Sequence, residues 1–523
     1  MKPFSEKVFL SLNMPTEDVP LGDRERIEAA LAVYGFAPVT FPLSVLRSLY
    51  PMCRDCGYDI TVTLVYRQSD WLVVAVEPGD TTAVHYGLAV DYGSTTIVMD
   101  LVDLRSGAVI GQEKEFNGQS AFGTDILTRI TYTMEDPQNR HTLQLATIQT
   151  FELLLDRLTE QTGINAKACP VMIVSGNTTM IHFLLELDAW TVFASPYAPV
   201  SSAPGWFRGA ELGMDFQGLI YIIPAASNYV GGDIVSGLLK LDIHKKDEIS
   251  LFFDIGTNGE LVIGNSQWMM AGAGAAGPAL EGYISRYGMR ASEGAIDTVR
   301  IEGSALHFTT IGGTKPRGIC GSGIIDLLAG MLKNGWINAA GDLEPTASER
   351  IIYLTDERQY AAVYATAEES AMGHRLFFTQ TDIKQYMDTK AAAYTMIDCL
   401  LEAAGVSPNE LSRCWLSGAF TTHSDLESAI TIGMFPDLPR DVYTCISNTS
   451  LEGARILLLD RAKLSEAKEL AEKIYCVQFA SIPDFLVRMQ AAKFLPHTDL
   501  DRFPSVKKQL AQNVSYDIIT KKR

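Results

Sequence analysis

Two aspartates each stand at the end of an apolar segment, directly before a turn rich in glycine and hydroxyl side chains. Residues 87–91 (GLAVD) precede residues 92–96 (YGSTT), and residues 251–254 (LFFD) precede residues 255–258 (IGTN). Glycine permits a tight turn and a close approach of the backbone to a ligand, and successive amide N–H groups in such a turn bind anions. An aspartate at a strand end can hold Mg²⁺, usually through water. Each segment therefore predicts a hairpin that cradles a phosphate group and its metal ion.

The same order of elements occurs in both segments, with Asp91 and Asp254 lying 163 positions apart. A single Asp-x-Gly-Thr segment is more often an ordinary β-turn with a polar tip. Two copies, each between apolar strands, favour an internal repeat on the scale of a whole lobe. Two such hairpins facing each other would hold a triphosphate and its Mg²⁺ between two lobes, which is the positioning and charge neutralisation that phosphoryl transfer needs.

Two further segments are compatible with a nucleotide site. Residues 414–420 (CWLSGAF) are typical of a strand entering a turn of small residues, which admits a nucleoside close to the backbone. A helix is expected to follow over 424–432, with Ser424 as its N-cap. Residues 318–323 (GICGSG) open an expected helix over 324–332. Glycines at a helix N-terminus receive an anion or allow close packing, and both interpretations stay open.

Residues 272–277 (GAGAAG) match the G-x-G-x-x-G pattern of dinucleotide-binding loops. Pro278 follows at once, and Asp297 precedes an expected strand instead of ending one. In dinucleotide-binding folds the acidic residue lies at a strand end, where it reaches the ribose. We therefore interpret this segment as a tight turn into a packed helix.

The elements around these motifs predict an α/β protein with a small first domain and two duplicated lobes. The first domain is expected over residues 1–83, the lobes over 84–246 and 247–498, and a C-terminal tail over 499–523. The expected strands of the first domain are 7–13, 59–66 and 71–76, its expected helices are 23–34 and 42–53, and residues 77–80 are an expected linker.

Composition narrows the classes of function. The chain has 523 residues, and its 43 basic and 62 acidic residues give a net charge of -19, which disfavours nucleic acid as a partner. No stretch approaches the roughly 18 apolar residues that span a bilayer, and the first residues do not resemble an export signal. We therefore expect a cytoplasmic protein without a membrane partner, in which the eight cysteines form no disulfide framework.

Taken together, these segments resemble one family, the ATP-dependent reductive activators of corrinoid proteins (RACo-like proteins). That family lies within the acetate and sugar kinase, Hsp70 and actin (ASKHA) superfamily, so the resemblance implies an actin-like ATPase with ribonuclease H-like lobes. The resembling segments are 87–96, 174–180 (VSGNTTM), 195–199 (SPYAP), 254–260 (DIGTNGE), 276–282 (AGPALEG), 288–291 (GMRA), 318–323, 379–383 (TQTDI), 390–392 (KAA), 417–420, 448–454, 483–485 and 494–497.

The resemblance implies ATP-driven reduction of a Co(II) corrinoid to the Co(I) methyl acceptor. Asp91 and Asp254 would then be catalytic, positioning Mg²⁺, through water, and the attacking water. The implied partners are a corrinoid protein or its methyltransferase, and a second copy of the chain in a homodimer. The residues expected to bind the nucleotide are Gly93, Ser94, Thr95, Thr96, Gly256, Thr257, Asn258, Gly321, Ser322, Gly418 and Ala419.

The chain departs from the family pattern in its cysteines. The family's electron enters through an N-terminal [2Fe–2S] domain, whose C-x₄-C-x₂-C run does not occur in this sequence. We therefore expect no such domain in this chain and a separate ferredoxin-like electron donor. Cys53 and Cys56 could hold a metal or a cluster shared by two subunits, but structural or incidental thiols are the favoured interpretation.

Two alternative functions stay open. A small-molecule kinase of the same fold would need a carboxylate base, for which Asp125 is a candidate, although a helix N-cap is the favoured interpretation of this residue. The absence of the ferredoxin run also allows a nucleotide-gated binding or regulatory partner of a corrinoid methyltransferase system.

Overall fold

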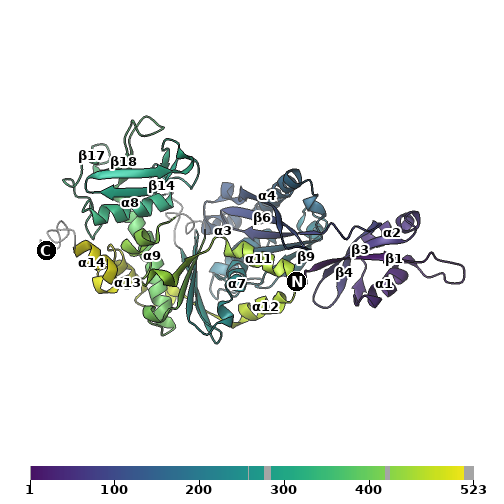
Figure 1. Cartoon of the computed structure of the whole chain (residues 1–523). Coiled ribbons are helices and arrows are strands. Elements are labelled where there is room, and N and C mark those ends of the chain that lie inside the picture. The colour runs from purple at the N-terminus through teal and green to yellow at the C-terminus, as the bar shows by residue number, and fades with distance from the viewer. Residues whose placement is uncertain (1, 257, 276–283, 419–423, 512–523) are drawn as a thin grey trace. The chain divides into compact units, whose positions relative to one another are not determined.

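The computed structural model describes residues 2–256, 258–275, 284–418 and 424–511. The chain divides into two compact units, one formed by Met1–Asp242 with Thr449–Lys473 and the other by Ile243–Asn448 with Ile474–Arg523. Within the described ranges, no helix is both long enough and apolar enough to cross a membrane. Figure 1 shows the elements of both units.

The first unit begins with the small α/β domain that the sequence predicts. Its sheet has the order β1-β3-β4-β2, and Ile27 and Leu31 of the first helix are buried in one core with Ile60, Val62 and Leu64 of β3. The alternation of apolar residues in β3 thus places its apolar face against the helices. Its elements are β1 (Ser5–Ser11), α1 (Asp23–Val33), β2 (Val39–Thr40), α2 (Leu43–Asp55), β3 (Asp59–Tyr66) and β4 (Trp71–Pro78).

Lobe I forms the rest of the first unit around a six-stranded sheet of order β7-β6-β5-β8-β10-β9. Its strands are β5 (Tyr86–Tyr92), β6 (Thr96–Asp103), β7 (Val109–Phe116), β8 (Val171–Gly176), β9 (Gly205–Arg208) and β10 (Leu219–Ile222). Its helices are α3 (Ile126–Glu135), α4 (Gln138–Thr162), α5 (Thr178–Leu184), α6 (Trp190–Phe193), α7 (Gly232–Leu241), α11 (Thr449–Leu459) and α12 (Lys463–Lys473).

The second unit is built on a six-stranded sheet of order β21-β20-β11-β12-β13-β22, with two three-stranded sheets, β15-β14-β16 and β17-β18-β19. Its strands are β11 (Ser250–Ile255), β12 (Asn258–Gly264), β13 (Met269–Ala275), β14 (Ala295–Glu302), β15 (Ala305–Thr310), β16 (Gly318–Ile319), β17 (Ile351–Leu354), β18 (Gln359–Ala365), β19 (Leu376–Thr379), β20 (Arg413–Ser417), β21 (Tyr443–Cys445) and β22 (Ile474–Val477). Its helices are α8 (Gly321–Lys333), α9 (Gln380–Ala403), α10 (Leu426–Thr431), α13 (Phe485–Ala492) and α14 (Pro504–Ala511).

The two large sheets repeat one topology, which confirms the predicted internal duplication. In lobe I, β5 pairs antiparallel with β6 and parallel with β8, and β8 pairs parallel with β10. In the second unit, β11 pairs antiparallel with β12 and parallel with β20, and β20 pairs parallel with β21. Each predicted hairpin therefore lies at the centre of its sheet.

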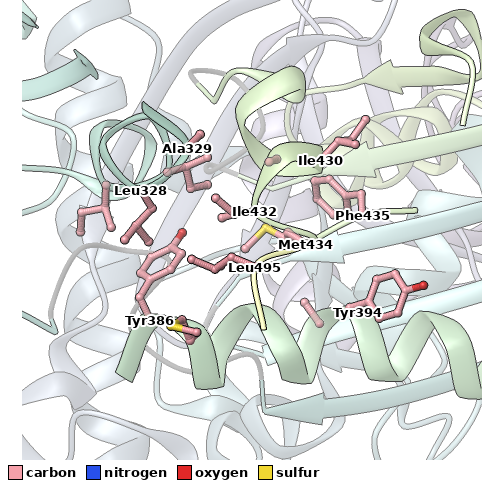
Figure 2. Packing of buried hydrophobic residues seen from close by; sticks show 14 of the residues in the cluster. Leu328, Ala329, Tyr386, Tyr394, Ile430, Ile432, Met434, Phe435 and Leu495 are labelled. Atoms are coloured by element: carbon pink, nitrogen blue, oxygen red, sulfur yellow. The ribbon is translucent and has the colours of Figure 1, made fainter. Parts of the chain in front are cut away.

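One large core holds the second unit together. Tyr386 of α9 lies near Leu328 of α8, as Figure 2 shows, whereas Tyr394 further along α9 lies 5.4 Å from Phe503 between ring centroids. Leu328 of α8 and Ile430 of α10 are fully buried. The same core includes Leu251 and Phe253 of β11 and Leu416 of β20, so the strands that lead to the second hairpin are part of it.

Three expectations from the sequence differ from the structure. Residues 272–275 continue strand β13 and do not form a turn, while residues 276 and 277 and the helix expected after them lie outside the described residues. Gly272 is needed in this strand because a Cβ there would lie 2.4 Å from the ring of Phe479. The N-cap of α10 is Asp425, which accepts a hydrogen bond from Ser428 N, and not Ser424. Residues 504–511 of the expected tail form helix α14, because Val506 and Leu510 are buried in the core.

The boundary between the lobes also differs from the expectation. The segment Thr449–Lys473 was expected to lie in the second lobe, but α11 and α12 belong to the first unit. The backbone of α11 approaches α7 closely, since a Cβ at Gly453 would lie 2.0 Å from Ser236 O. The contact of α11 with α7 brings Ser450, which lies far along the sequence, to Asp91 of the first hairpin.

Candidate active site

The first hairpin ends β5 and begins β6. Gly93 must be a glycine, because a Cβ there would lie 2.5 Å from the carbonyl oxygen of Thr96. Asn117 supports the turn from the end of β7: its side-chain Nδ2 donates to Gly93 O at 2.9 Å and its backbone N donates to Thr95 O at 2.9 Å. The turn that carries Ser94 is thus held from both sides before any ligand binds.

Asp91 is reached by a chain of three buried serine hydroxyls. Ser450, in the first turn of α11, donates its Oγ–H to Asp91 Oδ1 at 2.8 Å. Ser175 Oγ, at the end of β8, lies 2.9 Å from Ser450 Oγ and 2.8 Å from Ser236 Oγ of α7. These hydrogen bonds fix the orientation of the Asp91 carboxylate through three separate elements.

A second carboxylate lies beside Asp91. Burial raises the pKa of Asp233, in the first turn of α7, and the negative charge of Asp91 raises it further. Gly231 lets this turn approach the end of β8, since a Cβ there would lie 2.4 Å from Asn177 Cα. Two carboxylates that repel each other in a buried place favour a proton or a cation between them. This oxygen donor set suits Mg²⁺, which prefers oxygen ligands and keeps part of its water.

The second hairpin joins β11 to β12, with Asp254 as the second-last residue of β11. Gly256 N donates to Asn258 O at 2.9 Å and closes the turn. Gly418 follows β20 with φ +105°, and a Cβ there would lie 2.1 Å from Ile255 O and 3.2 Å from Asp254 Oδ1. The backbone of Gly418 therefore lies directly on the second hairpin, and only glycine fits at this position. Two predicted ligands of the nucleotide, Thr257 and Ala419, lie outside the described residues.

The two hairpins share a feature that the sequence analysis did not use. Asp91 pairs with Ser175 across β5 and β8, and Asp254 pairs with Ser417 across β11 and β20. Ser417 Oγ donates to Ser447 O at 3.0 Å. The repeated Ser-Gly pair after an apolar strand was a signal in the sequence for both serines, whereas nothing local pointed to Asp233.

Gly321 and Ser322 begin helix α8, which packs on β14. The Ser322 hydroxyl donates to the carbonyl oxygen of Asp297 at 2.9 Å, and a Cβ at Gly323 would lie 2.4 Å from Ile296 O. Close packing therefore accounts for the third glycine of this loop. The role of Gly321 and Ser322 in nucleotide binding stays a prediction.

Asp125 is the N-cap of α3, which confirms the favoured interpretation of this residue. Its carboxylate accepts hydrogen bonds from Thr128 N at 2.9 Å and Thr128 Oγ1 at 2.7 Å. Burial alone would raise the pKa of Asp125, but these hydrogen bonds hold the pKa below its ordinary value. A carboxylate engaged in this way is a poor general base, which weighs against the small-molecule kinase.

The Cys53-x-x-Cys56 pair has the surroundings of structural thiols. Burial raises the pKa of the Cys53 thiol to about 11, so the metal-binding thiolate is disfavoured. Cys56 Sγ donates to Cys53 O at 3.5 Å. The eight cysteines, all of which lie in the described residues, form no disulfide, and no group of three potential metal ligands among the described residues includes a cysteine.

The duplicated sheets and their two hairpins define the class of protein: they are those of an ASKHA domain. The model for the C-terminal ASKHA domain of RACo matches residues 248–507, and the models for its middle and linker regions match residues 86–246 and 1–83. The chain belongs to this family, the reductive activators of corrinoid proteins.

Known relatives agree with this assignment. A solved structure of a reductive activator for corrinoid, iron-sulfur protein is 35% identical, with a TM-score of 0.89 over 97% of this chain and 81% of that one. The corrinoid activation enzyme RamQ of Eubacterium limosum is 29% identical over 86% of this chain and 79% of its own. A reductase of the Co(II) methylated amine-specific corrinoid protein from Methanosarcina barkeri is 26% identical over 49% of this chain and 47% of its own.

Proposed function

We propose that this protein is an ATP-dependent enzyme that reduces the Co(II) form of a corrinoid protein to the Co(I) methyl acceptor. The observation that carries the proposal is the continuous match of the chain, from the small domain to α14, to a family whose characterised members activate corrinoid proteins. The identity of the corrinoid partner is left to experiment, because the relatives act on different corrinoid proteins.

ATP and Mg²⁺ are the proposed ligands of the two hairpins. Bound Mg²⁺ would neutralise charge on the phosphates and would be held, through water, by Asp91 and Asp254. Glycine at positions 93 and 418 lets the backbone pack closely at each hairpin, and successive backbone N–H groups in such turns bind anions. The residues proposed to bind the nucleotide are Gly93, Ser94, Thr95, Thr96, Gly256, Thr257, Asn258, Gly321, Ser322, Gly418 and Ala419.

The residues around Asp91 suit the orientation of an attacking water. Ser450 donates to the Asp91 carboxylate at 2.8 Å, and Ser175 in turn holds Ser450 at 2.9 Å. Asp233, whose pKa is raised by burial and by the charge of Asp91, is a second carboxylate of this site. We assign the positioning of the water to Asp91.

Helix α11 links this site to the small domain within one unit. Its first turn contacts Asp91 through Ser450, and near its end Leu458 O accepts a hydrogen bond from Phe4 N at 3.3 Å. Just after the helix, Arg461 bonds to Glu6 and lies over the ring of Trp71. A helix is a stiff element, so nucleotide binding at Asp91 would act on the small domain through α11. Such coupling must favour one state by several kcal/mol to shift the equilibrium by orders of magnitude.

The electron is proposed to come from a separate ferredoxin-like protein. The arrangement of the cysteines supports this, because the buried Cys53 thiol is a poor cluster ligand. Eight cysteines without a disulfide are also compatible with a reducing compartment, and we propose that the reaction takes place in the cytoplasm. A homodimer is proposed from family membership.

The test is the visible spectrum of a Co(II) corrinoid protein mixed anaerobically with this protein, a low-potential reductant and a ferredoxin, with and without Mg-ATP. Growth of the Co(I) band only with ATP is expected. A matched reaction uses Asp91→Asn, which keeps the size of the side chain and removes its charge, and should give no Co(I). Absence of Co(I) with the unchanged protein, despite ATP binding and an active control activator, would contradict reductive activation and favour a nucleotide-gated regulatory partner.

A further inference from the structure

A hollow of about 450 Å³ lies in the first unit where the small domain meets lobe I. Four cations line it, Lys2, Lys7, Arg105 and Arg461, together with one carboxylate, Glu6. The chain as a whole carries a net charge of -19. The lining of the hollow is therefore positively charged, although the chain as a whole is strongly negative.

Two of these cations are held in place by neighbouring acids. Lys7 Nζ lies 2.7 Å from Glu77 Oε2, and Arg461 Nη1 lies 2.6 Å from Glu6 Oε1. The side chains of Lys7 and Arg461 are only 11% and 18% exposed. They form an ordered wall whose charge is largely compensated.

The other two cations form no ion pair within the described part of the chain. Among the described residues, neither the Lys2 ammonium nor the Arg105 guanidinium has a carboxylate within ion-pair distance. Burial would raise the pKa of Asp103, but hydrogen bonds and the nearby Arg105 guanidinium hold it below its ordinary value, so the charge of Arg105 is partly compensated. Arg105 is positioned by a 2.9 Å hydrogen bond from Nη1 to Ala83 O. The nearby Asp103 carboxylate accepts instead from the backbone N of Arg105 and from Ser106 Oγ.

Neutral donors complete the lining. Ser5 and His85 are buried in the wall, with Ser5 Oγ 2.9 Å from His85 Nε2. The same pair joins the first strand of the small domain to the segment that leads into lobe I. A ligand in this hollow would therefore contact three parts of the chain, the N-terminal segment, residues 82–105 and the turn after α11.

We propose that this hollow is a second ligand site that binds a phosphorylated small molecule. Two ordered cations in ion pairs, two further cations outside ion pairs and hydroxyl donors match a phosphate group, which takes several charge-assisted hydrogen bonds at once. The volume suits a small molecule and not a protein segment. The site is separate from the hairpin of Asp91, and it does not depend on the proposed corrinoid reaction.

The test is a calorimetric titration with pyrophosphate at low ionic strength. The double variant K2A/R105A removes the two lining cations that form no ion pair with a described residue and leaves both hairpins unchanged. The matched control R300A/K473A removes two cations whose side chains are 79% and 70% exposed. We expect K2A/R105A to weaken one class of pyrophosphate binding by at least about tenfold, and the control to leave it unchanged. ATP affinity should be equal in all three proteins.

Three results would overturn the proposal. The first is that one equivalent of ATP displaces all of the pyrophosphate from the wild-type protein. This result would assign all pyrophosphate binding to the hairpins. The second is equal pyrophosphate affinity in K2A/R105A and R300A/K473A. The third is tighter binding of citrate than of pyrophosphate at the same site, which would assign it to carboxylates.

Discussion

At the scale of single residues, the candidate site depends on positions where only one type of side chain fits. Glycine at positions 93 and 418 is required because a Cβ would meet a backbone oxygen at 2.5 and 2.1 Å. Asp91 is oriented by a serine that is 359 positions away in the sequence. Replacing either glycine should distort its turn, and replacing the serine should release the Asp91 carboxylate from its orientation.

Replacing Ser450 with alanine should slow ATP hydrolysis by about tenfold, because a hydrogen bond to a charged group is worth about 1.5 kcal/mol or more. The measurement is steady-state phosphate release at saturating ATP. Ser481→Ala, which removes an exposed hydroxyl bonded to Gln478 O, is the matched control. Equal rates for the two variants would contradict the role of Ser450.

Gly418→Ala tests the approach of its turn to the second hairpin. The added methyl group would meet Ile255 O at 2.1 Å in a residue with φ +105°. Gly373→Ala is the control, because Gly373 has φ +68° and no atom within 4 Å of its would-be Cβ. We expect the control to lose about 1 kcal/mol of stability and Gly418→Ala to lose about 2 kcal/mol more, with much weaker ATP binding. Urea unfolding and ATP titration measure both.

At the scale of elements, helix α11 connects the candidate site to the small domain. It arises late in the sequence, joins the first unit, and contacts both Asp91 and the small domain. The contact of the small domain with lobe I also includes His85, which is buried against Ser5. The contribution of this contact to the free energy of unfolding should therefore depend on pH.

Burial lowers the pKa of His85 to about 4, the cations Lys7 and Arg105 act in the same direction, and Asp103 and Glu77 oppose them. The folded state thus binds fewer protons than the unfolded state between about pH 4 and 6.5, so stability is lost as the pH falls through this range. Between pH 7 and pH 5.5 the loss from His85 should be about 1.4 kcal/mol.

The measurement is urea unfolding of the wild type and of His85→Asn at both pH values. Asparagine does not titrate in this range, so the variant should lose about 1.4 kcal/mol less than the wild type over the same interval. Identical pH dependence of the two proteins would show that His85 is not buried in the neutral form.

At the scale of the whole molecule, one nucleotide should stabilise both units. Mg-ATP at a hundredfold excess over its Kd should add about 2.7 kcal/mol to the free energy of unfolding. Asp91→Asn and Asp254→Asn change different units, yet each should remove most of this stabilisation if both hairpins hold one ligand. Thermal unfolding with and without Mg-ATP measures it. Loss in only one variant would show that one hairpin binds the nucleotide alone.

Much of the fold could be predicted from the sequence because its signals are local. The apolar segments before Asp91 and Asp254 and the glycines after them specify two hairpins, since turn geometry depends on neighbouring residues. The helices and strands of the small domain follow apolar periodicity in the same way. Of the small sheets β14–β16 and β17–β19, only the strand at Asp297 was expected, because the short strands carry little periodic signal.

By itself, the sequence determined the duplicated hairpins, the positions of Asp91 and Asp254, and the family. Only the tertiary structure decided that Asp233 lies beside Asp91 and that Ser450 bonds to it. It also decided that α11 belongs to the first unit and that four cations surround one hollow. The physical reason is that turns and strand alternation are encoded by adjacent residues, whereas these contacts depend on how distant helices pack, which no local pattern specifies.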